Sequence, residues 1–169
     1  DEKTSFIKEV IECNEKLDTE VIEYNFKKHP YNDLLSLSYA SGVFSRFKID
    51  LEFKSNEYSK LYKKWLDKSI DDKKTKVFIN LIDNKIAGFI TLEEEENCFN
   101  IGLLAVEEEF KGRGVAASLI KYCEYFTFEK GKNHIEVVTQ GHNIPAIKFY
   151  KKNGFKINKI KYIHHYWNL

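Results

Sequence analysis

IGLLAVEEEFKGRGVA, residues 101–116, is the stretch that decides the fold class of this chain. It combines an apolar strand pattern, a short acidic turn and a glycine-rich basic loop that opens into a helix pattern. Gly112 and Gly114 remove side chains where a phosphate needs close approach to the backbone, and Lys111 and Arg113 add positive charge. The free N–H groups and dipole of a helix start attract the same anion. The stretch therefore predicts a site for a phosphate-bearing molecule.

The residues before this stretch predict an antiparallel meander. Two β-rich runs, 76–82 and 86–92, are separated by Asp83-Asn84-Lys85, which is a favourable hairpin turn. A second turn leads to the strand 99–106, in which Gly102 marks a bulge or a close backbone approach.

The residues after it predict a parallel pair of strands. Helical spacing runs from Val115 to the stop at 130–132, and a strand pattern follows at 134–139. Strand, helix and strand in this order imply a right-handed crossover. Asn143 is placed to cap a further helix that ends at 153–154, and the tail predicts one or two last strands.

The front of the chain carries helix-like patterns. Residues 3–28 show helical spacing of apolar side chains, interrupted near Asn14, and residues 56–70 fit an amphipathic helix. Residues 33–47 look irregular to helical. Together the patterns predict one α/β (α+β) domain over residues 1–169, with a mixed twisted sheet, helices on both faces and a parallel β-α-β unit after the meander.

Composition limits the partners. The net charge is +1 and the chain has acidic clusters at 93–96 and 107–109, so nucleic acid is a poor partner. No apolar run approaches the ~20 residues that span a bilayer and no signal peptide is visible, so we expect a cytoplasmic protein without membrane contact. The three cysteines (Cys13, Cys98 and Cys123) match no metal or redox spacing, and we expect reduced structural thiols and no metal. The chain begins at Asp1 without methionine, so we expect further residues upstream.

The carboxyl-terminal half resembles the GCN5-related N-acetyltransferase (GNAT) superfamily. The likeness rests on three signals in the family's order: the strand end LLAV at 103–106, the loop KGRGVA at 111–116, and NIPAIKFYKKNGF at 143–155. The loop has lysine where the family pattern has arginine or glutamine. The coincidence of all three over half the chain is strong, whereas the loop alone would equally fit a tight turn.

The resemblance implies acetyl-CoA as co-substrate and assigns roles by position. The strand end, including Leu104, Ala105 and Val106, would offer main-chain groups to the pantetheine arm. The loop would hold the diphosphate through Lys111, Gly112, Arg113, Gly114, Val115 and Ala116. Asn143 would contact the cofactor arm or serve as a helix cap. Tyr150 would assist the thioester sulfur; since a phenol (pKa about 10) is a weaker acid than a thiol (about 8.5), we expect hydrogen-bond donation rather than complete proton transfer.

A narrower resemblance, to bacterial TDP-fucosamine N-acetyltransferases, rests on SGVFSRF at 41–47, the helix at 62–65, the IGLLAV strand at 101–106 and VTQ at 138–140. It implies a nucleotide-linked 4-amino-4,6-dideoxyhexose as acceptor, for polysaccharide assembly. Arg46 is the expected contact to a phosphate or a ring hydroxyl, and Thr139 a further acceptor contact. Residues 1–75 would form a helical acceptor side and residues 76–169 the acetyl-CoA-binding core.

Other readings stay open at this point. The acceptor could be another small amine or a protein amine, and the chain could bind acyl-CoA without catalysis. No general base is assigned: Glu93–Glu96 resemble a solvated turn, His134 a structural residue, and His164 and His165 lie on the tail. A homodimer fits a small enzyme.

Overall fold

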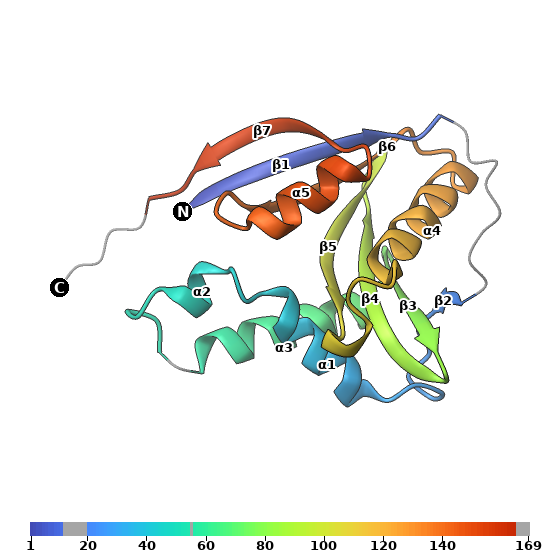
Figure 1. Ribbon diagram of the computed structural model, residues 1–169, viewed down its shortest axis with the longest axis horizontal. Coiled ribbons are helices and arrows are strands. Elements are labelled where there is room, and N and C mark those ends of the chain that lie inside the picture. Colours follow the sequence, from blue (N-terminus) through green and yellow to red (C-terminus); the bar gives the residue numbers. More distant parts are fainter. Residues whose placement is uncertain (12–19, 55, 165–169) are drawn as a thin grey trace.

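The computed structural model describes residues 1–11, 20–54 and 56–164 (Figure 1). In chain order its elements are β1 (Glu2–Glu9), β2 (Val21–Glu23), α1 (Tyr31–Ser41), α2 (Arg46–Ile49), α3 (Glu57–Asp71), β3 (Thr75–Ile82), β4 (Lys85–Glu94), β5 (Cys98–Val106), η1 (Glu108–Phe110), α4 (Val115–Glu129), β6 (His134–Gln140), α5 (Ile144–Lys152) and β7 (Lys156–Tyr162).

The strands form one seven-stranded mixed sheet in the order β2-β3-β4-β5-β6-β1-β7. The predicted meander is confirmed, because β3 and β5 each pair antiparallel with β4. Asp83 and Asn84 make its first turn with φ of 51° and 61°, the left-handed values that a tight hairpin needs. The predicted parallel pair is β5 with β6.

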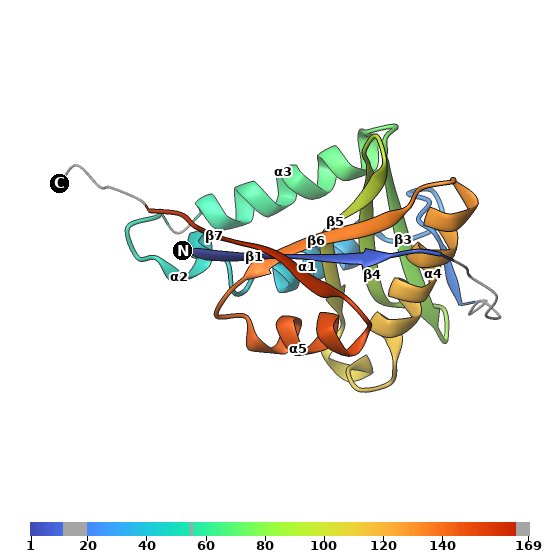
Figure 2. The ribbon, with the colours of Figure 1, turned by 90° about the horizontal axis from the view of Figure 1, so that it is seen from above.

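Helices cover both faces of the sheet, as predicted. Figure 2 shows α3 on one side of the strands and α4 and α5 on the other. One core cluster packs α1 and α3 against the meander, with Leu34, Leu66 and Phe89 fully buried. The second packs α4 and α5 against the opposite face and includes Leu119 and Tyr150. The sheet thus separates two cores, one on each of its faces.

The helix expected over residues 3–28 is wrong where the structure describes it. Residues Glu2–Glu9 form β1, which pairs antiparallel with β6 on one side and with β7 on the other. Residues Val21–Glu23 form the edge strand β2. The buried pair Thr4 and Phe6 follows the two-residue period of a strand, which the helical spacing of Phe6 and Val10 masked. Strand partners more than 120 residues away in the chain decided the outcome.

Candidate active site

Strands β5 and β6 separate halfway along their length. Their parallel pairing runs only from Cys98 with His134 to Ile101 with Val137, although both strands continue further. The register of β4 with β5 shifts at the same level, between Ile90 and Leu92, so the bulge expected near Gly102 is present. Thr91 Oγ1 accepts a hydrogen bond of 2.8 Å from the bulged Leu103 N–H. This bond stabilises the bend that opens the sheet.

The opening leaves backbone groups of β5 without a strand partner. The N–H groups of Leu103 and Glu107 point toward β4, since they donate to Thr91 Oγ1 and the Ala87 carbonyl oxygen. Alternation along a strand therefore turns the polar groups of Leu104 and Val106 toward the gap. They can bond an extended chain laid in the gap, as a further strand would.

The loop 111–116 lies where β5 leads into α4. Gly112 and Gly114 have φ of +78° and +86°, and a Cβ built at either position would meet nothing within 4 Å. In the part of the chain that the structure describes, no backbone carbonyl accepts from the N–H of either glycine. The first N–H groups of α4 add to this set. Open space faced by free N–H groups fits a diphosphate.

The two cations of the loop differ in their surroundings. Lys111 pairs with the carboxylate of Glu108, whereas Arg113 lies over the ring of Phe110, 5.4 Å from its centroid. Gly88 lets the loop end approach the sheet, because a Cβ there would lie 2.9 Å from Val115 Cγ1. The loop is thereby held beside the end of β5.

Tyr150, on α5, is 5% exposed and lies in the second core, with its ring centroid 5.8 Å from that of Phe6. Among the described residues its hydroxyl group makes no hydrogen bond, and the residue lines a cavity of about 200 Å³. Burial, with a smaller contribution from Cys123, raises the pKa of Tyr150 well above its ordinary value. The phenol is therefore protonated and free to donate into the cavity.

Asn143 caps α5, as predicted. Its Oδ1 accepts from the N–H of Ala146 (3.2 Å) and its Nδ2 donates to Thr139 Oγ1 (3.1 Å). The side chain thus ties the end of β6 to the start of α5. Thr139, Asn143 and Tyr150 all line the cavity.

The opposite wall of the cavity comes from the segment around α2. Gly42 is required there, because a Cβ would lie 2.1 Å from the ring of Tyr62. Ser45 Oγ accepts from the N–H of Phe47 at the start of α2. His142 Nε2 lies 3.0 Å from the carbonyl oxygen of Phe44, which links this segment to the loop before α5.

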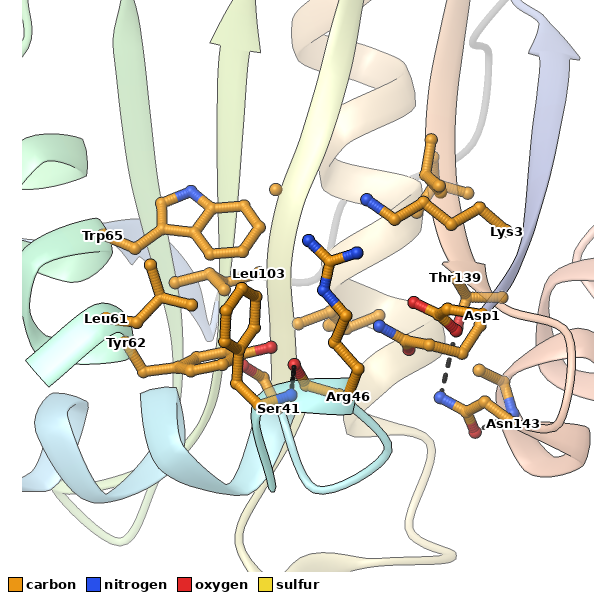
Figure 3. A pocket seen from close by; sticks show the side chains of 18 of the residues that line it. Asp1, Lys3, Ser41, Arg46, Leu61, Tyr62, Trp65, Leu103, Thr139 and Asn143 are labelled. Atoms are coloured by element: carbon orange, nitrogen blue, oxygen red, sulfur yellow. Dashed lines mark hydrogen bonds between the residues drawn. The ribbon is translucent and has the colours of Figure 1, made fainter. Parts of the chain in front are cut away.

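Arg46 points into the cavity from α2 (Figure 3). Its Nη1 is buried, and no acceptor in the described ranges reaches it. The guanidinium lies over the ring of Phe47, with Cζ 4.9 Å from the centroid. A buried guanidinium nitrogen without an acceptor is costly, so it indicates a missing anionic or carbonyl partner.

The cavity brings together Leu104, Thr139, Asn143, Tyr150 and Arg46, while Ala105, Val106 and the loop 111–116 lie outside its lining. The structure adds lining residues to which sequence analysis gave no role in the site, among them Lys3, Tyr62, Trp65 and Gln140. Lys3 was not considered, because the helix expected over residues 3–28 did not place it beside β6. Tyr62 and Trp65 were recognised as part of the apolar face of a helix and of the narrower resemblance, without a role in the site.

The residues weighed as a general base lie outside this cavity or outside the description. Glu94 pairs with Lys132, and His134 lies 3.5 Å from a carboxylate oxygen of Glu136. His164 does not line the cavity, and His165 falls beyond the described residues. Cys98 and Cys123 lie outside it too, and burial raises the pKa of both thiols. Cys13 is not among the described residues.

Within the described ranges, no group of three or more His, Cys, Asp or Glu side chains is placed to hold a metal. Nor is any helix in those ranges both long and apolar enough to cross a membrane.

Comparison with known proteins agrees with this geometry. The sequence model of the acetyltransferase (GNAT) family matches residues 43–155, which include the β5 strand end, the glycine loop and Tyr150. The chain belongs to the GNAT family. Its members use acetyl-CoA as acyl donor, and the gap and loop described above fit that molecule.

Three curated relatives illustrate the range of the family. An uncharacterized N-acetyltransferase of Methanocaldococcus jannaschii is 26% identical over 80% of this chain and 61% of that protein. Streptothricin acetyltransferase of Escherichia coli is 27% identical, over 64% of this chain and 63% of that protein. A spore coat polysaccharide biosynthesis protein of Bacillus subtilis is 21% identical, over 73% and 43%. The chain thus spans less than two thirds of the length of these relatives.

The fold recurs in solved structures. The PaiA N-acetyltransferase of Thermoplasma acidophilum, solved in complex with coenzyme A, aligns with a TM-score of 0.65 at 20% identity. The alignment covers 82% of this chain and 90% of that one, so the two chains share the same fold.

Proposed function

We propose that this chain is an N-acetyltransferase that acts on the amino group of a nucleotide-linked amino-deoxysugar of the 4-amino-4,6-dideoxyhexose type. The observation that carries the proposal is the cavity, which places the free hydroxyl of Tyr150 and the unpaired guanidinium of Arg46 around one space. The resemblance to TDP-fucosamine N-acetyltransferases at 41–47 and the distant polysaccharide-biosynthesis relative support this choice of acceptor.

In this proposal acetyl-CoA supplies the acetyl thioester. The loop 111–116 binds its diphosphate and the free polar groups of Leu104 and Val106 hold its extended arm, while Leu104 and Tyr150 line the same cavity. Residues 76–164 thus form the acetyl-CoA side, and the α1–α3 region forms most of the acceptor side of a single domain.

Tyr150 acts as a hydrogen-bond donor to the sulfur rather than as a strong acid. Because burial raises its pKa, complete proton transfer to a thiolate would be less favourable than for a phenol in water. A hydrogen bond that strengthens as negative charge develops on sulfur still lowers the barrier. The amine attacks directly, since the buried, protonated Cys123 is a poor nucleophile and lies outside the cavity.

The test is a thiol-release assay with acetyl-CoA and a panel of amines. The panel contains TDP- and UDP-linked 4-amino-4,6-dideoxyhexoses, spermidine, an aminoglycoside, a free amino acid and a peptide amine. We expect kcat/KM for a nucleotide-linked sugar to exceed that for the other amines by at least about 100-fold, the discrimination that several charge-assisted contacts supply.

A preference for any other amine contradicts the acceptor assignment and leaves the acetyltransferase assignment standing. Acetyl-CoA binding by calorimetry without turnover on any amine contradicts catalysis and favours an acyl-CoA-binding module.

A further inference from the structure

Lys3 brings a second unpaired cation to the cavity. It lies on β1, lines the cavity, and makes no ion pair with any of the described side chains. Figure 3 shows its amino group and the guanidinium of Arg46 pointing toward the same space from opposite walls. Of these two cations, only Arg46 was expected at the site from the sequence. Two cations that converge without an acid between them repel each other unless an anion is bound.

A third cation lies beside Lys3 on the neighbouring strand. Lys161 of β7 is the direct cross-strand partner of Lys3, so both side chains stand on one face of the sheet. Gln140 of β6 is the partner of Lys3 on the other side and also lines the cavity. Like charges directly opposite one another destabilise a sheet. Lys161, too, has no ion pair recorded within the described ranges.

The acidic groups nearby are few. Among the described residues, Asp1 is the one acidic residue that lines the cavity, and Glu136 lies on the same face of β6 but beside His134. Within the described ranges, the corner formed by Arg46, Lys3 and Lys161 therefore presents three cations and, in Asp1, one carboxylate. The loop 111–116 lies outside the cavity lining, so this corner is distinct from the expected diphosphate site of acetyl-CoA.

We propose that Arg46, Lys3 and Lys161 form a second diphosphate subsite, which binds the anionic part of the acceptor while its amine faces Tyr150. This inference rests on the proposed function and names the residues that bind the diphosphate of its nucleotide-linked acceptor. A single carboxylate has two oxygens, whereas Arg46 and Lys3 line the cavity from α2 and β1, and Lys161 of β7 lies beside Lys3. A larger oxyanion with several charges suits this arrangement better than a carboxylate does. Gln140 adds a neutral donor to the same rim.

The experiment is calorimetry on the whole chain saturated with coenzyme A, so that the loop 111–116 is already filled. The probes are inorganic pyrophosphate, thymidine diphosphate and acetate. We expect pyrophosphate and thymidine diphosphate to bind and acetate to bind at least about 10-fold more weakly. Arg46→Gln and Lys3→Gln should each raise the Kd for thymidine diphosphate at least about 10-fold, because each removes a charge-assisted contact.

Lys156→Gln is the matched control. It removes one positive charge from β7, the strand of Lys161, but Lys156 lies opposite Ile7 rather than opposite Lys3. It should change the affinity less than about twofold. Lys161→Gln gives a readout independent of affinity. It should raise the thermal midpoint of the free protein, since it relieves the repulsion with Lys3, and pyrophosphate should stabilise it less than the wild type.

Three outcomes overturn the subsite: equal affinity of wild type, Arg46→Gln and Lys3→Gln, loss of diphosphate binding when coenzyme A is added, or tighter binding of acetate than of pyrophosphate. The last assigns the corner to a carboxylate. Thiol release with an uncharged amine, together with no diphosphate binding, rejects the subsite and keeps the acetyltransferase. Diphosphate binding without thiol release on any amine rejects the proposed activity and keeps the subsite.

Discussion

At the scale of single residues, Tyr150 combines two properties that a buried tyrosine rarely keeps without a use. Its ring is packed against Phe6, Phe149 and Phe155, with centroids 5.4–5.8 Å away, so its position is fixed. The residue lines the cavity, and its hydroxyl group makes no hydrogen bond among the described residues. Since buried hydroxyl groups usually find a partner, the partner here is expected to be bound substrate.

Tyr150→Phe should lower kcat about 10-fold or more and leave the affinity for acetyl-CoA nearly unchanged. The reason is that the hydroxyl group acts on charge that develops at sulfur, while the ring packing stays intact. Steady-state kinetics and calorimetry measure the two quantities. An unchanged kcat in the folded variant removes Tyr150 from the mechanism.

The pH dependence of stability gives a control on Tyr150 that needs no substrate. Its folded-state pKa lies above the unfolded value of 10.0, so the protonated form is the one that folding favours. The resulting stability is complete below pH 10 and is lost as the pH rises toward the folded pKa. Tyr150→Phe should therefore lose less stability than the wild type between pH 9 and about pH 11, measured by denaturant unfolding.

At the scale of elements, helix α4 has a glycine in the left-handed region at each of its ends. Gly114 at φ +86° lets the chain turn into the helix without a side chain in front of the free N–H groups. Gly131, at the other end of α4, has φ +66° and also nothing within 4 Å. The two positions share their backbone conformation, but only Gly114 belongs to the loop 111–116 that is expected to bind the diphosphate.

Gly114→Ala should raise the Kd for acetyl-CoA about 10-fold, because a methyl group would enter the space of the diphosphate. Gly131→Ala is the control: both changes should cost about 1 kcal/mol of stability through strain, but only the first should affect binding. Calorimetry and thermal unfolding separate the two effects. Equal Kd values for both variants would mean that the diphosphate lies elsewhere.

The bulge of β5 depends on one side-chain hydrogen bond. Thr91→Val removes the acceptor of the Leu103 N–H and should cost about 1–3 kcal/mol, since that amide is buried. It should also raise KM for acetyl-CoA, because the gap between β5 and β6 loses its support. Thr127→Val is the matched control, as Thr127 Oγ1 is buried with no partner in the described structure. That change should be neutral or stabilising, and a similar loss in both variants contradicts the role of Thr91.

At the scale of the whole molecule, β1 joins the first residues of the chain to its last strand. It lies between β6 and β7, and Figure 1 shows it running alongside β7 above α5. Phe6 of β1 is 0% exposed, and its ring packs against the ring of Tyr150 in the second core. The position of the candidate catalytic residue therefore depends on a strand that is about 140 residues distant in sequence.

Phe6→Leu should lower kcat several-fold and cost about 1–2 kcal/mol, because the ring that packs against Tyr150 is replaced by a smaller side chain. Phe99→Leu is the control, since Phe99 is 2% exposed and packs against Phe126 instead. It should lose similar stability without the effect on kcat. Equal kcat values for the two variants would show that Phe6 does not position Tyr150.

Much of the site was predictable because its parts are local. The turn at Asp83-Asn84, the cap Asn143 and the helix start after Gly114 are each set by residues within a few positions. Their backbone angles and hydrogen bonds need no distant partner. Lys3 was not predictable in this way, because its neighbours Gln140 and Lys161 come from the other end of the chain.

The sequence by itself determined the meander, the crossover and the glycine loop, since short-range periodicity and left-handed glycines specify them. The tertiary structure alone decided that residues 2–9 form a strand and that Lys3, with Lys161 beside it, lies at the cavity that Arg46 lines. The physical reason is that a strand is completed by hydrogen bonds to its neighbours. Which neighbours it receives depends on the packing of the whole sheet rather than on its own residues.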